Sequence, residues 1–141
     1  MEIVPISPDR EMLKLLQGCD LPVSDIDSSD SLYFYGCHGD GKVTGVVGLE
    51  VHGKVALIRS LAVCSNLRRF GVGGLLVQFA ENMARKKGVE SLFLLTTTAS
   101  EFFERLGYEY YQRENAPESI KATAQFSGLC PATSSFMGKS L

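Results

Sequence analysis

The clearest pattern in the chain is a helical spacing of apolar residues in its middle. Between Val72 and Met83 apolar positions recur every three or four residues and polar residues occupy the other face, which predicts an amphipathic helix that Gly88 ends. Mostly apolar runs before it (55–63) and after it (91–96) predict strands. Because strand, helix and strand follow in order, we expect the two strands to pair in parallel.

Tight turns divide the segment before this unit. Apolar runs at 32–35, 43–51 and 55–63 are separated by Asp40-Gly41 and Gly53-Lys54, which are typical of hairpins and predict an antiparallel meander. Nearer the amino terminus, a short strand over 2–6 precedes Ser7-Pro8-Asp9, which predicts the start of a helix that ends at Gly18. The polar residues 24–31 predict a loop.

The last third of the chain alternates short helical and strand patterns. Thr98-Ala99-Ser100-Glu101 has capping-box spacing and predicts a helix that ends at Leu106-Gly107. Residues 108–112 predict a strand, 117–127 a helix and 133–137 a last strand. The complete pattern predicts one α+β domain over residues 1–141, with a mixed, largely antiparallel sheet of roughly six or seven strands flanked by about four helices.

Composition narrows the functional classes. A charged fraction of 21% and a net charge of −2 give no reason to expect nucleic-acid or anionic-membrane binding. No apolar run approaches the roughly 20 residues that span a bilayer, and the amino terminus has no signal-peptide pattern, so we expect a cytoplasmic protein. The four cysteines and two histidines show no metal-ligand spacing, which predicts reduced thiols and no metal site.

A basic, glycine-rich loop joins the strand at 55–63 to the amphipathic helix. It reads Arg68-Arg69-Phe70-Gly71-Val72-Gly73-Gly74, and backbone N–H groups at a helix start with nearby arginines favour a phosphate ligand. A nucleotide-hydrolysing P-loop is unlike it, because no Lys-Ser or Lys-Thr follows the glycines. A dinucleotide fingerprint is also unlike it, because Leu76 stands where the third glycine is required.

The loop resembles the coenzyme A pyrophosphate loop of the GNAT acyltransferase superfamily, whose motif is [RQ]-x-x-G-x-[GA]. The resemblance covers about residues 32–111 and includes Ser-Leu-Ala-Val before the loop and Phe102-Phe103-Glu104-Arg105-Leu106-Gly107-Tyr108 after the helix. With Leu94-Leu95-Thr96-Thr97, this second segment is similar to the acetyltransferase part of N-acetylglutamate synthases. The 117–131 segment also looks like that of the arsenic-resistance N-acetyltransferases. A GNAT-like fold with acetyl-CoA as cosubstrate is what the resemblance implies.

The resemblance also implies roles for residues around the coenzyme. The Leu61–Val63 strand segment would pair with the pantetheine arm, and a backbone N–H at or near Leu61 would act catalytically on the thioester oxygen. Phe103 stands where many relatives have a proton-donating tyrosine, so Thr97, Thr98, Ser100 or solvent would substitute. The expected coenzyme-binding residues are Leu61, Ala62, Val63, Arg68, Arg69, Phe70, Gly71, Val72, Gly73, Gly74 and Phe103.

The catalytic base and the acceptor-binding residues are less clearly indicated by the sequence than the coenzyme loop is. Glu50, on the strand next to the pantetheine strand, is the candidate catalytic base, directly or through water, and a solvated strand glutamate is the alternative. Arg59 and Thr97 are the candidate acceptor-binding residues, since a mid-strand arginine suits a carboxylate. A structural ion pair of Arg59 with Glu50 or another acid is the alternative. Lys121 and Gln125 suit either the acceptor or an exposed helical face.

These features together predict an N-acetyltransferase that moves acetyl from acetyl-CoA to a small, amino-acid-like amine through a ternary complex. Its expected partners are this small-molecule acceptor and, at most, a second copy in a homodimer. Two alternatives stay open: a protein N-acetyltransferase, and a noncatalytic sensor of acyl-CoA or arsenicals, which Phe103 and the four cysteines would suit.

Overall fold

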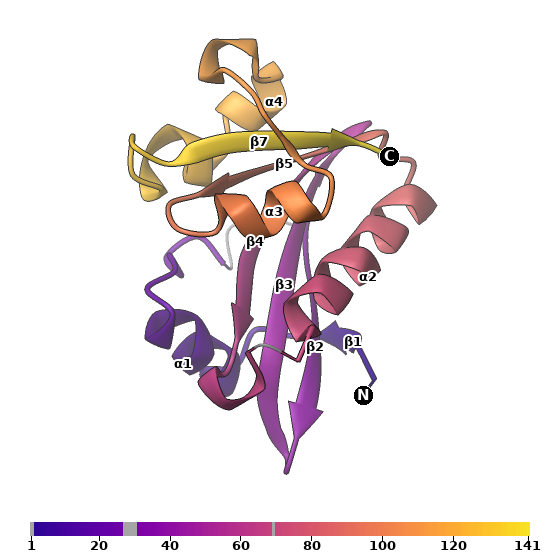
Figure 1. Cartoon of the computed structure of the whole chain (residues 1–141), viewed down its shortest axis with the longest axis vertical. Helices are drawn as coiled ribbons and strands as arrows, with labels where there is room; N and C mark the ends of the chain where they lie inside the picture. Colours follow the sequence, from indigo (N-terminus) through magenta and orange to yellow (C-terminus); the bar gives the residue numbers. More distant parts are fainter. Residues whose placement is uncertain (1, 27–30, 69) are drawn as a thin grey trace.

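The computed structural model describes residues 2–26, 31–68 and 70–141, which form one seven-stranded sheet with helices on both faces (Figure 1). The strand order is β1-β2-β3-β4-β5-β7-β6. The strands are β1 (Val4–Ile6), β2 (Leu32–Gly39), β3 (Lys42–His52), β4 (Val55–Val63), β5 (Ser91–Thr96), β6 (Glu109–Tyr110) and β7 (Ser135–Ser140). The α-helices are α1 (Arg10–Gly18), α2 (Val72–Lys86), α3 (Ser100–Arg105) and α4 (Glu118–Lys121).

The predicted pairings, the antiparallel series from β2 to β4 and the parallel pair of β4 with β5, are both present, and β1, β7 and β6 extend the sheet at its two ends. β1 to β4 form an antiparallel series, β5 pairs with β4 in parallel, and β7 pairs antiparallel with β5 and β6. Asp40 and Gly41 both have positive φ, 53° and 77°, as the predicted two-residue hairpin between β2 and β3 requires. The expectation of a mixed, largely antiparallel α+β fold is therefore confirmed.

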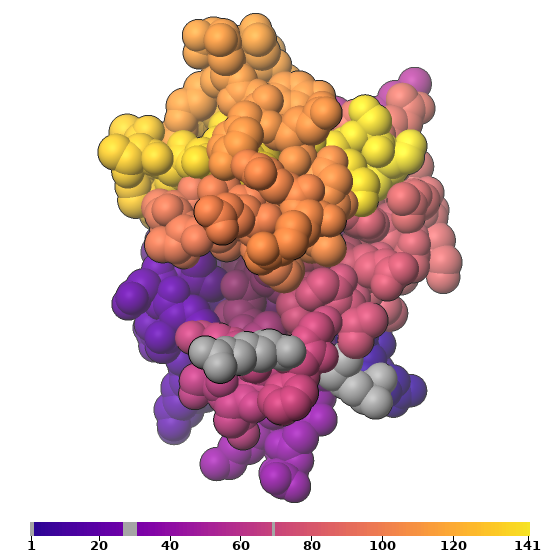
Figure 2. Space-filling model, viewed as in Figure 1, coloured from indigo at the N-terminus to yellow at the C-terminus, as the bar shows by residue number. Residues whose placement is uncertain are grey.

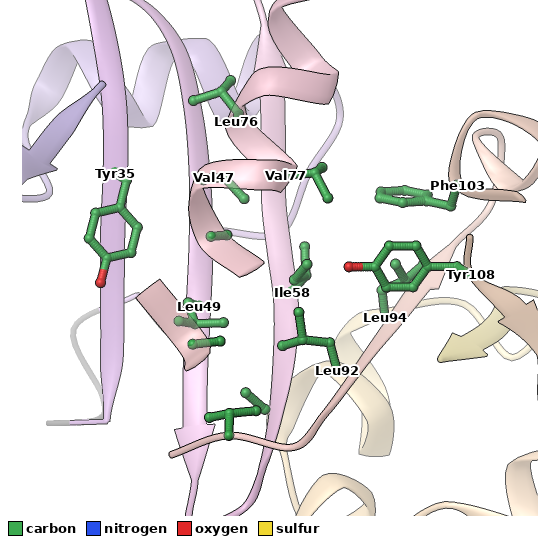
Figure 3. Packing of buried hydrophobic residues seen from close by; sticks show 14 of the residues in the cluster. Tyr35, Val47, Leu49, Ile58, Leu76, Val77, Leu92, Leu94, Phe103 and Tyr108 are labelled. Atoms are coloured by element: carbon green, nitrogen blue, oxygen red, sulfur yellow. The ribbon is translucent and has the colours of Figure 1, made fainter. Parts of the chain in front are cut away.

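Alternation along the strands divides the core between the two faces of the sheet. Helices α2 and α3 pack on one face over Val47, Leu49, Ile58 and Leu94, where Phe103 and Tyr108 close the core beside β5 (Figure 3). On the other face α1 packs on one half of the sheet, while α4 packs over β4, β5 and β7. On this second face the apolar cluster under α1 is thus separate from the apolar cluster under α4.

β4 contains the irregularity that positions the site. Val46 pairs with Ala62 but Gly48 pairs with Arg59, so Ser60 and Leu61 together oppose a single residue of β3, which is a β-bulge. Ser60 has a φ of 57°, which is rare for a residue with a side chain. The pairing of β4 with β5 runs only from Val55–Ser91 to Ile58–Leu94. The two strands therefore diverge from Arg59 onward.

Three predictions at the carboxyl-terminal half need correction. The helix expected over 117–127 is interrupted after α4 and resumes as a π-helical turn, Gln125–Leu129; the Thr123 hydroxyl donates to Ile120 O and accepts from Phe126 N, which competes with the helical ladder. The strand expected over 108–112 is only β6. The N-cap of α3 is Ala99 rather than a capping-box residue, and Thr96 Oγ1 accepts its N–H instead.

Candidate active site

A cavity of about 720 Å³ opens where β4 and β5 diverge. Its walls come from the free edge of β4, from β5 and the residues after it, from the turn that follows α1, and from the π-helical turn with the approach to β7. In the space-filling view the surface is recessed where the indigo, pink and orange parts of the chain meet (Figure 2). Segments from the whole length of the chain thus meet at one hollow.

The glycine-rich loop lies at the end of β4 and begins α2. Gly71 is the N-cap of α2 with a φ of 77°, and the first helical bond runs from Leu75 N to Gly71 O. The N–H groups of Val72, Gly73 and Gly74 precede that bond, so the helix itself gives them no acceptor. This is the arrangement expected of an anion site at a helix start.

Arg68 connects the glycine-rich loop to two neighbouring segments. Arg68 lines the cavity; its Nε donates to Val63 O at 3.0 Å and its Nη2 to Cys19 Sγ at 3.3 Å. These contacts tie the loop to β4 and to the end of α1. Phe70 is 75% exposed. Arg69, the other predicted coenzyme contact, lies outside the described residues.

The predicted pantetheine segment also lines the cavity. Its β4 wall includes Leu61, Ala62 and Val63, which lie beyond the last residue of β4 that pairs with β5. Phe103 lines the same cavity from α3 and is 5% exposed, with its ring edge-on to Phe102 and Tyr108. A buried phenyl ring supplies an apolar wall and no proton.

Arg59 lies at the base of the divergence in a buried cluster of charged groups. Its guanidinium binds the Asp25 carboxylate through both terminal nitrogens, lies 3.4 Å from Glu50 Oε1 and donates from Nε to Ser60 Oγ at 3.2 Å. Glu50 Oε2 is 2.7 Å from His52 Nε2. The alternative of an ion pair with Glu50 or another acid is thus present, and Arg59 still lines the cavity while Glu50 is not among its lining residues.

Several polar residues that line the cavity with Arg59 were not singled out by the sequence pattern. Thr97, the predicted acceptor contact, lines the cavity, and so do Cys130 and Ser134. Gln125 is 5% exposed and lines the wall, rather than lying on an exposed helical face. Burial raises the pKa of the Cys130 thiol, although nearby Arg59 and Arg113 oppose this effect. No local signal could have found Asp25, since its partner is 34 residues away.

Metal and membrane features are lacking in the parts of the chain that the structure describes. Residues 2–26, 31–68 and 70–141 contain no group of three or more His, Cys, Asp or Glu side chains placed to hold a metal ion. Across the same ranges, no helix combines the length and the hydropathy that a membrane crossing needs. All four cysteines are described and are free thiols.

A family model for GNAT acetyltransferases matches residues 7–108, which include the loop and both walls of the cavity formed by β4 and β5. The chain belongs to the GNAT acetyltransferase family. The GNAT-like fold expected from the glycine loop is therefore confirmed.

Individual relatives agree with this assignment. An uncharacterized N-acetyltransferase of Chlorobaculum tepidum is 40% identical over 81 residues, 57% of this chain and 52% of the relative. The structure is similar to N-acetylglutamate synthase from Neisseria gonorrhoeae, complexed with coenzyme A and N-acetyl-glutamate (TM-score 0.80, 20% identity, 99% of this chain and 35% of the synthase). An acetyltransferase of Streptococcus agalactiae is similar over 99% of this chain and 98% of its own (TM-score 0.78, 17% identity).

Two of these relatives are longer than the part that matches this chain. This GNAT chain spans about half the length of the Chlorobaculum relative and about a third of the Neisseria synthase. The similarity to the synthase is confirmed for the fold. The resemblance to arsenic-resistance acetyltransferases and the cytoplasmic location stay predictions.

Proposed function

We propose that the chain is an acetyl-CoA-dependent N-acetyltransferase whose acceptor is a small, amino-acid-like amine. The observation that carries this proposal is the divergence of β4 from β5 at Ser60, which leaves a strand edge open between an anion-binding loop and a buried polar cluster. Family membership supports acetyl transfer as the reaction. The Neisseria synthase, whose structure contains coenzyme A and N-acetyl-glutamate, supports an amino-acid-like acceptor.

Donor binding is assigned to the loop and to the open edge of β4. The amides of Val72, Gly73 and Gly74 and the Arg68 guanidinium would hold the pyrophosphate, and we assign the same role to Arg69, Phe70 and Gly71. Leu61, Ala62 and Val63 would pair with the pantetheine arm as an added strand, with Phe103 as an apolar wall. A backbone N–H at or near Leu61 would donate to the thioester oxygen as negative charge develops there.

Proton removal is assigned to Glu50. An alkyl ammonium has a pKa near ~10, so the amine must lose a proton before or during attack. Because Glu50 is not among the residues lining the cavity and is linked to His52, we propose that it acts through ordered water. Arg59 and Thr97 line the cavity beside β4 and β5 and are our candidates for contact with the acceptor. The departing thiolate would take its proton from Thr97, Thr98, Ser100 or solvent.

The proposal is tested by release of free coenzyme A thiol from acetyl-CoA in the presence of an amine panel. We expect release with amino acids, and we expect Arg68→Ala to raise the KM for acetyl-CoA about tenfold, since a charge-assisted hydrogen bond is lost. Arg105→Ala, at an exposed arginine of α3, is the matched control and should leave this KM unchanged. An unaltered KM in Arg68→Ala would contradict the assignment of the loop.

A noncatalytic sensor is the second candidate, because Cys19 and Cys130 line the same cavity and Phe103 has no hydroxyl group. In that case acetyl-CoA or arsenite would raise the melting temperature while no amine releases thiol. Loss of the arsenite shift in Cys19→Ser and Cys130→Ser would identify an arsenical sensor.

A further inference from the structure

Two buried polar atoms in the cavity wall have no hydrogen-bond partner among the described residues. They are the amide nitrogen Nε2 of Gln125, at the start of the π-helical turn, and the hydroxyl Oγ of Ser134, just before β7. Both side chains are more than nine-tenths buried, and both residues line the cavity. Buried polar groups are nearly always paired, so two unpaired groups in one wall require an explanation.

The hydrogen bonds around these residues define what is missing. Gln125 Oε1 accepts from the Cys130 thiol at 3.1 Å, which leaves the amide nitrogen as a donor without an acceptor. The Ser134 backbone is fully used, since its N–H donates to Pro131 O at 2.9 Å and its carbonyl accepts from Arg113 at 3.1 Å. The amide nitrogen needs a group that accepts hydrogen bonds, and the Ser134 hydroxyl can donate to the same group.

The neighbouring charges place this pair at the acceptor end. Cys130, which bonds Gln125, lies within electrostatic reach of Arg59 and Asp25. The cavity-lining part of β4 runs from Ile58 to Val63, so Arg59 lies near one end of it and Val63, which accepts from Arg68, lies at the other. The pair is thus on the side of the cavity that the coenzyme loop does not occupy.

We infer that Gln125 and Ser134 form an acceptor subsite that binds a carboxylate or carboxamide oxygen next to the amine to be acetylated. This inference rests on the proposed function and specifies its acceptor. Asp25 and Glu50 already bind the Arg59 guanidinium, so recognition of an oxygen needs the additional donors that these two side chains offer. Both atoms are buried in this structure, so the inference requires each side chain to turn toward the cavity when the acceptor binds.

The test compares matched amines as acceptors. The panel contains the standard L-amino acids, their amides, and the decarboxylated amines with the same side chains, such as phenylalanine, phenylalaninamide and 2-phenylethylamine. Thiol release should be at least tenfold more efficient, in kcat/KM, for an acid or its amide than for the matched amine, because one directed hydrogen bond accounts for about that factor. A preference for the acid or for the amide identifies which oxygen group is bound.

Variants assign the preference to the two residues. Gln125→Leu and Ser134→Ala should each raise the KM for the preferred acceptor about tenfold and leave the KM for acetyl-CoA and the rates with decarboxylated amines unchanged. Gln112→Leu and Ser140→Ala make the same chemical changes at exposed positions and should have no effect. If Gln125→Leu does not fold, Ser134→Ala decides, since it removes only an unpaired hydroxyl.

Different outcomes would contradict the acceptor subsite and the acetyltransferase function. Thiol release that is equally efficient with decarboxylated amines overturns the subsite and leaves the acetyltransferase function standing. An unchanged acceptor KM in both variants, or an equal loss with every amine, overturns it as well. No thiol release with any amine overturns the proposed function, and the subsite with it.

Discussion

Arg59 is the cation that pairs with two buried carboxylates of this GNAT domain. Its side chain is 1% exposed and meets two carboxylates, Asp25 from the turn after α1 and Glu50 from β3. Burial of charged groups is costly unless each charge is paired, and removal of one partner leaves the others uncompensated. Arg59 thus holds the α1 segment against the sheet next to the bulge at Ser60.

Replacement of Arg59 by methionine should therefore destabilise the fold strongly. With Arg59→Met, two buried carboxylates lose their cation, and we expect a loss of about 3–5 kcal/mol in the free energy of unfolding. Urea unfolding at pH 7 measures it. Arg105→Met, the same change at an exposed position, should alter stability by less than about 0.5 kcal/mol. Equal stabilities of the two variants would show that Asp25 and Glu50 do not depend on Arg59.

At the scale of elements, the start of α2 must serve two purposes. Its first-turn amides face the proposed coenzyme, and its side packs against α3. A Cβ added at Gly73 would lie 3.2 Å from Phe102 Cζ, whereas one at Gly74 would meet only Leu106 Cδ2 at 4.0 Å. The close approach of α2 to α3 therefore depends on a glycine at 73 and not on one at 74.

The two glycines should respond differently to alanine. Gly74→Ala should stabilise the domain by up to about 1 kcal/mol, because alanine is the better helix former and the added methyl group has room. Gly73→Ala should be less stable than Gly74→Ala, since the Phe102 ring must move. Urea unfolding without added coenzyme measures both variants, and Gly73→Ala as stable as Gly74→Ala would contradict the packing argument.

At the scale of the whole molecule, a buried carboxylate joins α2 to the segment after α3 and to β7. Glu81 on α2 accepts from Tyr108 OH at 2.8 Å and from Lys139 Nζ on β7 at 3.0 Å. Tyr108, which follows α3, points into the core beside Leu94 and Phe103 (Figure 3). Burial, and next the Glu81 carboxylate, raise the pKa of Tyr108 well above its ordinary value.

This contact should make stability fall in alkaline solution. Above pH ~10 the unfolded chain releases the Tyr108 proton while the folded chain retains it. The contribution of Tyr108 to the free energy of unfolding is therefore fully present below pH ~10 and is lost as the pH rises above it. The loss is about 1.4 kcal/mol per pH unit. The unfolding free energy should therefore fall less between pH 8 and pH 11 in Tyr108→Phe than in the wild type. Tyr110→Phe, at an exposed tyrosine, should retain the wild-type difference.

Local patterns predicted most of this molecule. The spacing of apolar residues from Val72 to Met83, the Asp40-Gly41 turn and the loop at Arg68 each act over a few residues, so their structure can be inferred from the letters alone. The same holds for the order of the sheet up to β5. The prediction was wrong at 117–127, where the Thr123 hydroxyl replaces helical hydrogen bonds that the apolar spacing alone would have retained.

The sequence by itself determined the fold class and the loop proposed to bind the coenzyme, because turn chemistry and helical periodicity are local, and the resemblance of that loop to a known motif indicated the family. Tertiary structure alone decided which residues form the proposed acceptor end of the cavity. Asp25, Arg59, Gln125 and Ser134 come from four separate segments, and a buried polar side chain takes its meaning from whatever group packing brings to it. Only the folded chain could show that Arg59 is already paired and that the Gln125 amide and the Ser134 hydroxyl are not.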